Sequence, residues 1–98
     1  MKLAIDVKFV RDGKPGTAHA EVPFETGRHD LPKEYPFTEK AAYVGPDAGY
    51  SLSWLDIDAE GRKITFGYVW TVVLDEEGKG RYVVEKRTGD MTFEFSLI

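Results

Sequence analysis

The chain has 98 residues, no cysteine and a formal net charge of −4, with basic residues interleaved among acidic ones. This length predicts a single domain over residues 1–98, and the composition excludes a disulfide framework and a thiolate metal site. Without a clustered basic stripe we expect no nucleic-acid partner, and without a run of about 18 apolar residues we expect no membrane span. We expect a cytoplasmic protein, with secretion after leader removal as the alternative.

The N-terminal part of the chain predicts a β-hairpin. Apolar and polar residues alternate from Leu3 to Phe9, which is typical of a half-buried strand. Residues 11–16 supply Asp, Pro and Gly for a turn, and the alternation resumes from Thr17 to Phe24. Pro23 has no N–H for a ladder, so this part of the second strand is expected at a sheet edge or leaving the sheet.

A long crossing follows from Thr26 to Gly49, with three prolines and no sustained period. It predicts at most one helical turn, beginning at Thr38, and an additional short strand around Arg28 to Leu31. A connection of this length is uncommon in a compact domain and is often functional.

The second half of the chain is dominated by period-two alternation from Ile64 to Asp75, which predicts one long central strand. A less regular strand is expected from Tyr50 to Asp58, and two more from Arg81 to Thr88 and from Met91 to Ile98. These segments predict a C-terminal meander of about four strands. The whole chain therefore predicts an all-β fold, either an antiparallel β-sandwich or a partly closed barrel of about six to seven strands.

The inward-facing positions of these strands define a predicted core. It consists of Leu3, Ile5, Val7, Phe9, Val22, Phe24, Leu52, Trp54, Phe66, Tyr68, Trp70, Val72, Tyr82, Val84, Phe93, Phe95 and Leu97. A second, mixed face includes Leu55, Ile57, Val69, Val73 and Val83. We expect the hairpin or the crossing to cover that face; left uncovered, it would serve as a dimer or partner surface.

The chemical motifs are sparse. Asp56 to Gly61 matches the first half of a calcium loop, but the twelfth position is Gly67 where a bidentate Glu is needed, so an acidic hairpin turn is the favoured interpretation. The two histidines, His19 and His29, would ligate zinc only if folding joined them with a carboxylate; an exposed strand histidine and a loop histidine are favoured. We expect no cofactor and, without a convergent set of titratable groups, no enzyme.

Two functional hypotheses remain. The first is a small acidic protein-binding module, similar in kind to an inhibitor or immunity protein, that uses the Thr26–Gly49 crossing; its candidate contact residues are His29, Tyr35, Phe37, Tyr43 and Tyr50. The partner would be another protein or a second copy of the chain. The alternative is a barrel or sandwich that binds a small apolar or carbohydrate ligand through Trp54, Tyr68 and Trp70, although their alternation favours a core position.

Overall fold

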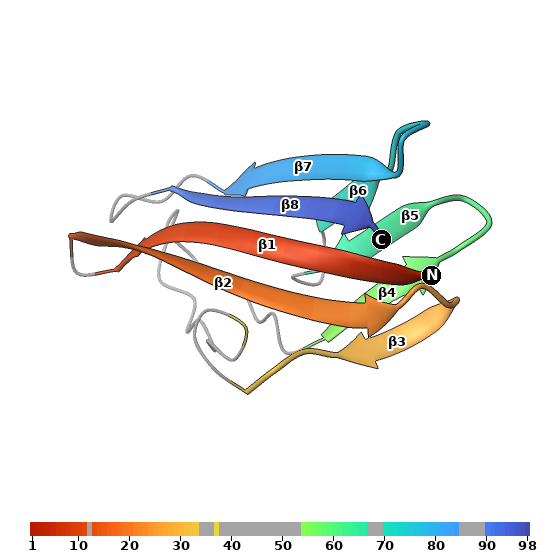
Figure 1. Cartoon of the computed structure of the whole chain (residues 1–98), viewed down its shortest axis with the longest axis horizontal. Coiled ribbons are helices and arrows are strands. Elements are labelled where there is room, and N and C mark those ends of the chain that lie inside the picture. The colour runs from red at the N-terminus through yellow and green to blue at the C-terminus, as the bar shows by residue number, and fades with distance from the viewer. Residues whose placement is uncertain (12, 34–36, 38–53, 67–69, 85–89) are drawn as a thin grey trace.

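The computed structural model describes residues 1–11, 13–33, 37, 54–66, 70–84 and 90–98. The regular structure of these residues consists of eight β-strands (Figure 1): β1 (Lys2–Arg11), β2 (Lys14–Pro23), β3 (Gly27–Asp30), β4 (Trp54–Asp58), β5 (Lys63–Phe66), β6 (Trp70–Val73), β7 (Lys79–Val84) and β8 (Met91–Leu97). They form two antiparallel sheets, sheet A with the order β2-β1-β8-β7 and sheet B with the order β3-β4-β5-β6. The predicted all-β antiparallel fold is confirmed. Within the described residues, no helix is long and apolar enough to cross a membrane.

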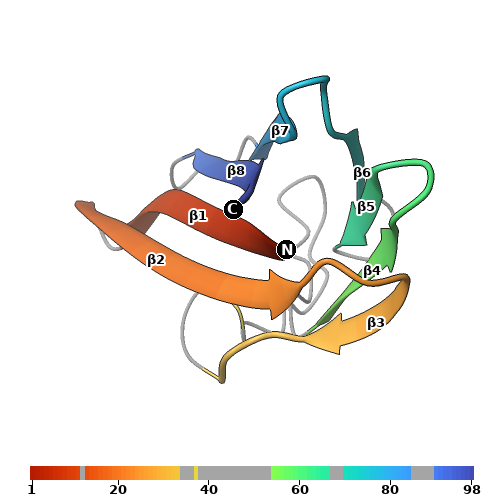
Figure 2. The ribbon, with the colours of Figure 1, turned by 45° about the vertical axis from the view of Figure 1, so that its right-hand side comes forward.

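The two sheets enclose one apolar core. Figure 2 shows sheet A and sheet B joined through the β2–β3 and β6–β7 connections. At the centre of the core, the Phe66 ring of β5 lies 5.1 Å from Phe93 and 5.2 Å from Phe95 of β8, measured between ring centroids. Tyr82 of β7 meets the same ring edge-on at 5.7 Å. Because each buried aromatic side chain contributes roughly 1.5–3 kcal/mol, these contacts between the sheets are a main source of stability.

Sheet A is built on the predicted N-terminal hairpin. Leu3 pairs with Val22 and Val7 pairs with Ala18, which keeps the apolar residues of both strands on the same face. Pro23 ends β2, which is an edge strand as expected. The additional strand expected near Arg28 is present as β3, the edge strand of sheet B.

The prediction of one long strand from Ile64 to Asp75 is wrong. β5 and β6 are antiparallel neighbours, with Ile64 opposite Val72 and Phe66 opposite Trp70. The chain therefore reverses between Phe66 and Trp70, but both halves keep their apolar residues on the inner face. The alternation runs through the reversal without a break, which is why it resembled a single strand. In sheet B, β4, β5 and β6 are paired in chain order, and in sheet A, β7 is paired with β8. The chain passes from sheet B to sheet A between β6 and β7.

The core differs from the predicted one mainly at β4. Leu55 and Ile57 are buried, at 1% and 3% exposure, because Leu55 lies opposite the inward-facing Phe66. The prediction of Trp54 as a core residue is wrong, since this register places its side chain on the outer face of sheet B. The buried set also includes Leu31, Phe37, Ile64, Leu74 and Met91, which the predicted core omitted.

The mixed second face does not exist as one surface. Its Leu55 and Ile57 belong to the core, whereas Val73 and Val83 are 63% and 40% exposed on β6 and β7, in different sheets. Leu52, Tyr68 and Val69, together with most of the long crossing and the helical turn expected from Thr38, lie outside the described residues.

Candidate functional site

The outer face of sheet B carries an aromatic residue that the core does not use. Trp54 lies at the start of β4, opposite Asp30 of the edge strand β3. The guanidinium carbon of Arg28, also on β3, lies 4.6 Å from the centroid of the Trp54 ring. The Arg28 Nε is 3.7 Å from a carboxylate oxygen of Asp30, and both side chains are mostly exposed. Arginine and tryptophan therefore form a stacked pair at the surface, beside the start of the long crossing.

The charge around this pair is predominantly acidic. Asp56 lies opposite Arg28 in the β3–β4 ladder, and Asp58 lies further along the same outer face of β4. Lys63 of β5 is opposite Asp58. Across β3, β4 and β5 this face holds the aspartates Asp30, Asp56 and Asp58 against the cations Arg28 and Lys63.

The residues predicted for partner binding are distributed differently. His29 of β3 is on the inner face, where its Nε2 donates a hydrogen bond of 2.7 Å to the Glu25 carbonyl oxygen. Phe37 is fully buried at 0% exposure, so its ring anchors the crossing to the core and does not present a contact surface. Tyr35, Tyr43 and Tyr50 lie outside the described residues.

The structure does not bring together Trp54 and Trp70, the two described members of the predicted ligand site. Trp70 is on the inner face, where its ring lies 5.6 Å from Phe66 and 5.8 Å from Tyr82. Trp54 is on the opposite face of the same sheet, and Tyr68 is outside the described residues. The two tryptophans therefore cannot close on one ligand.

The core between the sheets is filled where its packing is described. The space there amounts to about 10 Å³, next to Phe37 and Phe66. A cavity of this size holds at most one water molecule.

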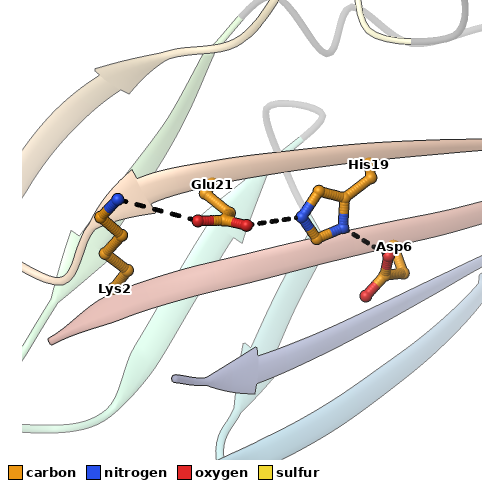
Figure 3. Close-up of polar contacts among 4 residues, drawn as sticks. All are labelled: Lys2, Asp6, His19 and Glu21. Atoms are coloured by element: carbon orange, nitrogen blue, oxygen red, sulfur yellow. Dashed lines mark hydrogen bonds and ion pairs between the residues drawn. The ribbon is translucent and has the colours of Figure 1, made fainter.

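A second polar group lies on the outer face of sheet A (Figure 3). His19 of β2 is directly opposite Asp6 of β1, and its Nδ1 lies 2.6 Å from the Asp6 Oδ1. On the other side of the ring, His19 Nε2 lies 2.8 Å from Glu21 Oε2. The Lys2 ammonium is 3.8 Å from the second oxygen of Glu21. The four side chains form an alternating line of charge along the hairpin.

These contacts change the acid–base properties of the pair. Hydrogen bonding to Glu21, and then to Asp6, raises the pKa of His19 above its ordinary value of 6.5. The hydrogen bond from His19 lowers the pKa of Glu21 below its ordinary value of 4.5. His19 is about half exposed, so the individual ion pairs are of the modest kind found at surfaces.

Neither histidine forms part of a metal centre in the described chain. Asp6 and Glu21 bind opposite edges of the His19 ring, so both ring nitrogens are already engaged. His29 belongs to the other sheet. Among the described residues, no group of three or more His, Cys, Asp or Glu is arranged to hold a metal ion. At the acidic turn after β4, the Asp58 Oδ1 accepts a hydrogen bond of 3.2 Å from the Gly61 N–H, which is the role of a turn cap.

Comparison of the chain with family models, curated proteins and solved structures gives no match. The Arg28–Trp54 pair and the His19 group are therefore interpreted from their own geometry.

The sequence alone predicted neither the Arg28–Trp54 contact nor the His19–Asp6 contact. The polar alternation placed His19 and Glu21 on one face of a strand, but the contact with Asp6 depends on the hairpin register. Arg28 and Trp54 meet only because β3 pairs with β4, and nothing local in the sequence indicates that pairing.

Proposed function

We propose that the protein is a small acidic protein-binding module that contacts its partner at the beginning of the Thr26–Gly49 crossing. The contact surface is centred on the outer face of β3 and β4. The observation that supports this function is the Arg28 guanidinium stacked on the Trp54 ring at the edge of sheet B.

The stacked pair has the chemistry of an interface anchor. Tryptophan and arginine are the residue types that most often dominate binding energy at protein interfaces. A guanidinium held on an aromatic face is already oriented, so less side-chain entropy is lost when a partner binds. Trp54 occupies an outward position, whereas Leu55 and Ile57 of the same strand are buried in the core.

The charge of the surface indicates the chemistry of the partner. Asp30, Asp56 and Asp58 outnumber the cations Arg28 and Lys63 on this face. The chain as a whole carries a net charge of −4. A partner with a basic patch would be steered toward this face, and a carboxylate on the partner would suit Arg28.

The test is a matched pair of charge reversals combined with site-specific photo-crosslinking. Arg28→Glu changes the proposed surface, and Arg81→Glu makes the same charge change on the outer face of β7 in sheet A. A photo-crosslinker at position 56, opposite Arg28, is expected to form a defined covalent adduct with the partner protein. Arg28→Glu should abolish this adduct, and Arg81→Glu should retain it. Circular dichroism and thermal melting should show that both variants are folded. Equal loss of the adduct in both variants, or no adduct from Asp56, would reject this surface.

A further inference from the structure

We propose that Asp6, His19 and Glu21 form a proton-operated clasp that reinforces the attachment of the edge strand β2 to β1 when His19 is charged and weakens it when His19 is neutral. The clasp lies on the outer face of the β1–β2 hairpin (Figure 3). The Arg28–Trp54 pair belongs to sheet B.

The contact geometry itself requires a charged ring. The Nδ1 and Nε2 atoms of His19 lie 2.6 and 2.8 Å from carboxylate oxygens of Asp6 and Glu21. An ionised carboxylate only accepts hydrogen bonds, so both contacts require a proton on the facing nitrogen. A neutral imidazole carries one such proton. Loss of the other leaves a nitrogen lone pair facing a carboxylate, and one side of the clasp is broken.

The contact between His19 and Asp6 is the one that joins β2 to β1. Glu21 lies on the same strand as His19, whereas Asp6 lies across the ladder on β1. The His19–Asp6 contact therefore links the edge strand to its neighbour in addition to the backbone hydrogen bonds. Breaking it loosens β2 locally and leaves the aromatic core unchanged.

The surrounding charges make His19 hard to replace as a cation. Asp6 also lies directly opposite Glu94 of β8, so two like charges meet in the centre of the face. The Lys8 ammonium of β1 contacts Glu94 at 3.5 Å, and Lys2 of the same strand contacts Glu21 at 3.8 Å. Arg81 of β7 lies one strand further, opposite Glu94. In the described chain, the cation in contact with Asp6 is His19.

The direction of the pH response follows from these contacts. Above the lowered pKa of Glu21, the clasp is fully formed up to the ordinary histidine value of 6.5, and it is lost as the pH rises through the higher pKa of His19 in the folded protein. Glu21, whose pKa is lowered by the hydrogen bond from His19, stays ionised throughout that range. The hairpin edge therefore weakens from neutral to mildly alkaline pH.

The test follows the ring and the strand together in the intact protein. The ¹⁵N chemical shifts of the His19 ring should show two protonated nitrogens at pH 6 and a pKa above 6.5. Across that titration, the exchange protection of the β2 amides bonded to β1, corrected for intrinsic exchange rates, should fall by a factor of about two to five, while that of β8 amides stays constant. In His19→Gln the β2 step should disappear.

Two further variants separate the clasp from a general effect of pH. Asp6→Asn and Glu21→Gln should each move the pKa of His19 back toward 6.5. A His19 ring that is neutral at pH 6.5 would overturn the proposal. So would a β2 step that persists in His19→Gln, or a His19 pKa that neither carboxylate variant changes.

Discussion

Phe66 lies at the centre of the described aromatic contacts, so its replacement should be strongly destabilising. Its side chain is 1% exposed, and its ring lies within 5.1 to 5.7 Å of the rings of Trp70, Tyr82, Phe93 and Phe95. Phe66→Ala removes this burial and leaves a void, which should lower the free energy of unfolding by about 3–5 kcal/mol. Phe66→Leu keeps most of the apolar volume but loses the ring pairs, so about 1–3 kcal/mol is expected. Small domains have only about 5–15 kcal/mol of stability in total.

Urea unfolding measures this difference directly. Trp70 is 5.6 Å from Phe66, so its fluorescence reports the packing that the substitutions change. The matched control is Val73→Ala in the same hairpin; Val73 is 63% exposed and should cost no more than about 0.5 kcal/mol. With a slope of about 1–3 kcal/mol per molar urea, Phe66→Ala should lower the midpoint by about 1 M or more. Midpoints for Phe66→Ala and Val73→Ala that agree within error would refute the central position of this ring.

Three further predictions concern close approaches and charge. A Cβ at Gly16 would lie 2.6 Å from the Phe9 ring, so Gly16→Val should lower the free energy of unfolding in urea by about 1–3 kcal/mol. The same substitution in a Phe9→Leu background should recover most of this loss. No recovery would exclude the clash as its cause. A Cβ at Gly80 would collide with Val72 where β7 approaches β6, so Gly80→Ala should lower the melting temperature by about 4–8 °C or more, with partial rescue by Val72→Ala; a stable single variant would contradict the close approach. Because the pKa of Glu21 is lowered by His19, its contribution is present above 4.5 and is lost as the pH falls through that lower value. Melting temperatures from pH 3 to pH 6 should therefore fall less on acidification in Glu21→Gln than in the unmodified chain, and parallel curves would contradict this.

The sequence predicts those parts of the fold in which alternation and turn chemistry agree. In the N-terminal hairpin, apolar residues at Leu3 and Val22 share a face, and the turn between the strands fixes the register that brings them together. The same criterion failed from Ile64 to Asp75. Alternation with a period of two shows which side chains share one face of a sheet. Two paired strands that both turn their apolar residues to the same face have the same alternation as one long strand.

The β4 strand shows a second limit. Trp54, Leu55 and Ile57 offer apolar residues on both faces, so local pattern does not decide which side is buried. Strand pairing determines which side is buried. Leu55 lies opposite the inward-facing Phe66 of β5, so the Leu55 side of β4 faces the core. Position on the outer face in turn makes Trp54 available to Arg28. The candidate site therefore depends on strand pairing between distant segments, which one sequence does not specify.

The place of β1 in sheet A has a consequence for how the chain folds. β1 is the first strand of this sequence and pairs with β8, the last one, with Leu3 opposite Leu97. Until β8 has been synthesised, the β1–β2 hairpin has one strand edge without its native partner, next to an apolar face. Such an intermediate is prone to pair with other chains. Pairing of β1 with β8 closes a loop that contains all the strands between them. This pairing is therefore slow compared with formation of the local hairpins. Removal of β8 should therefore yield aggregates and not a smaller folded domain.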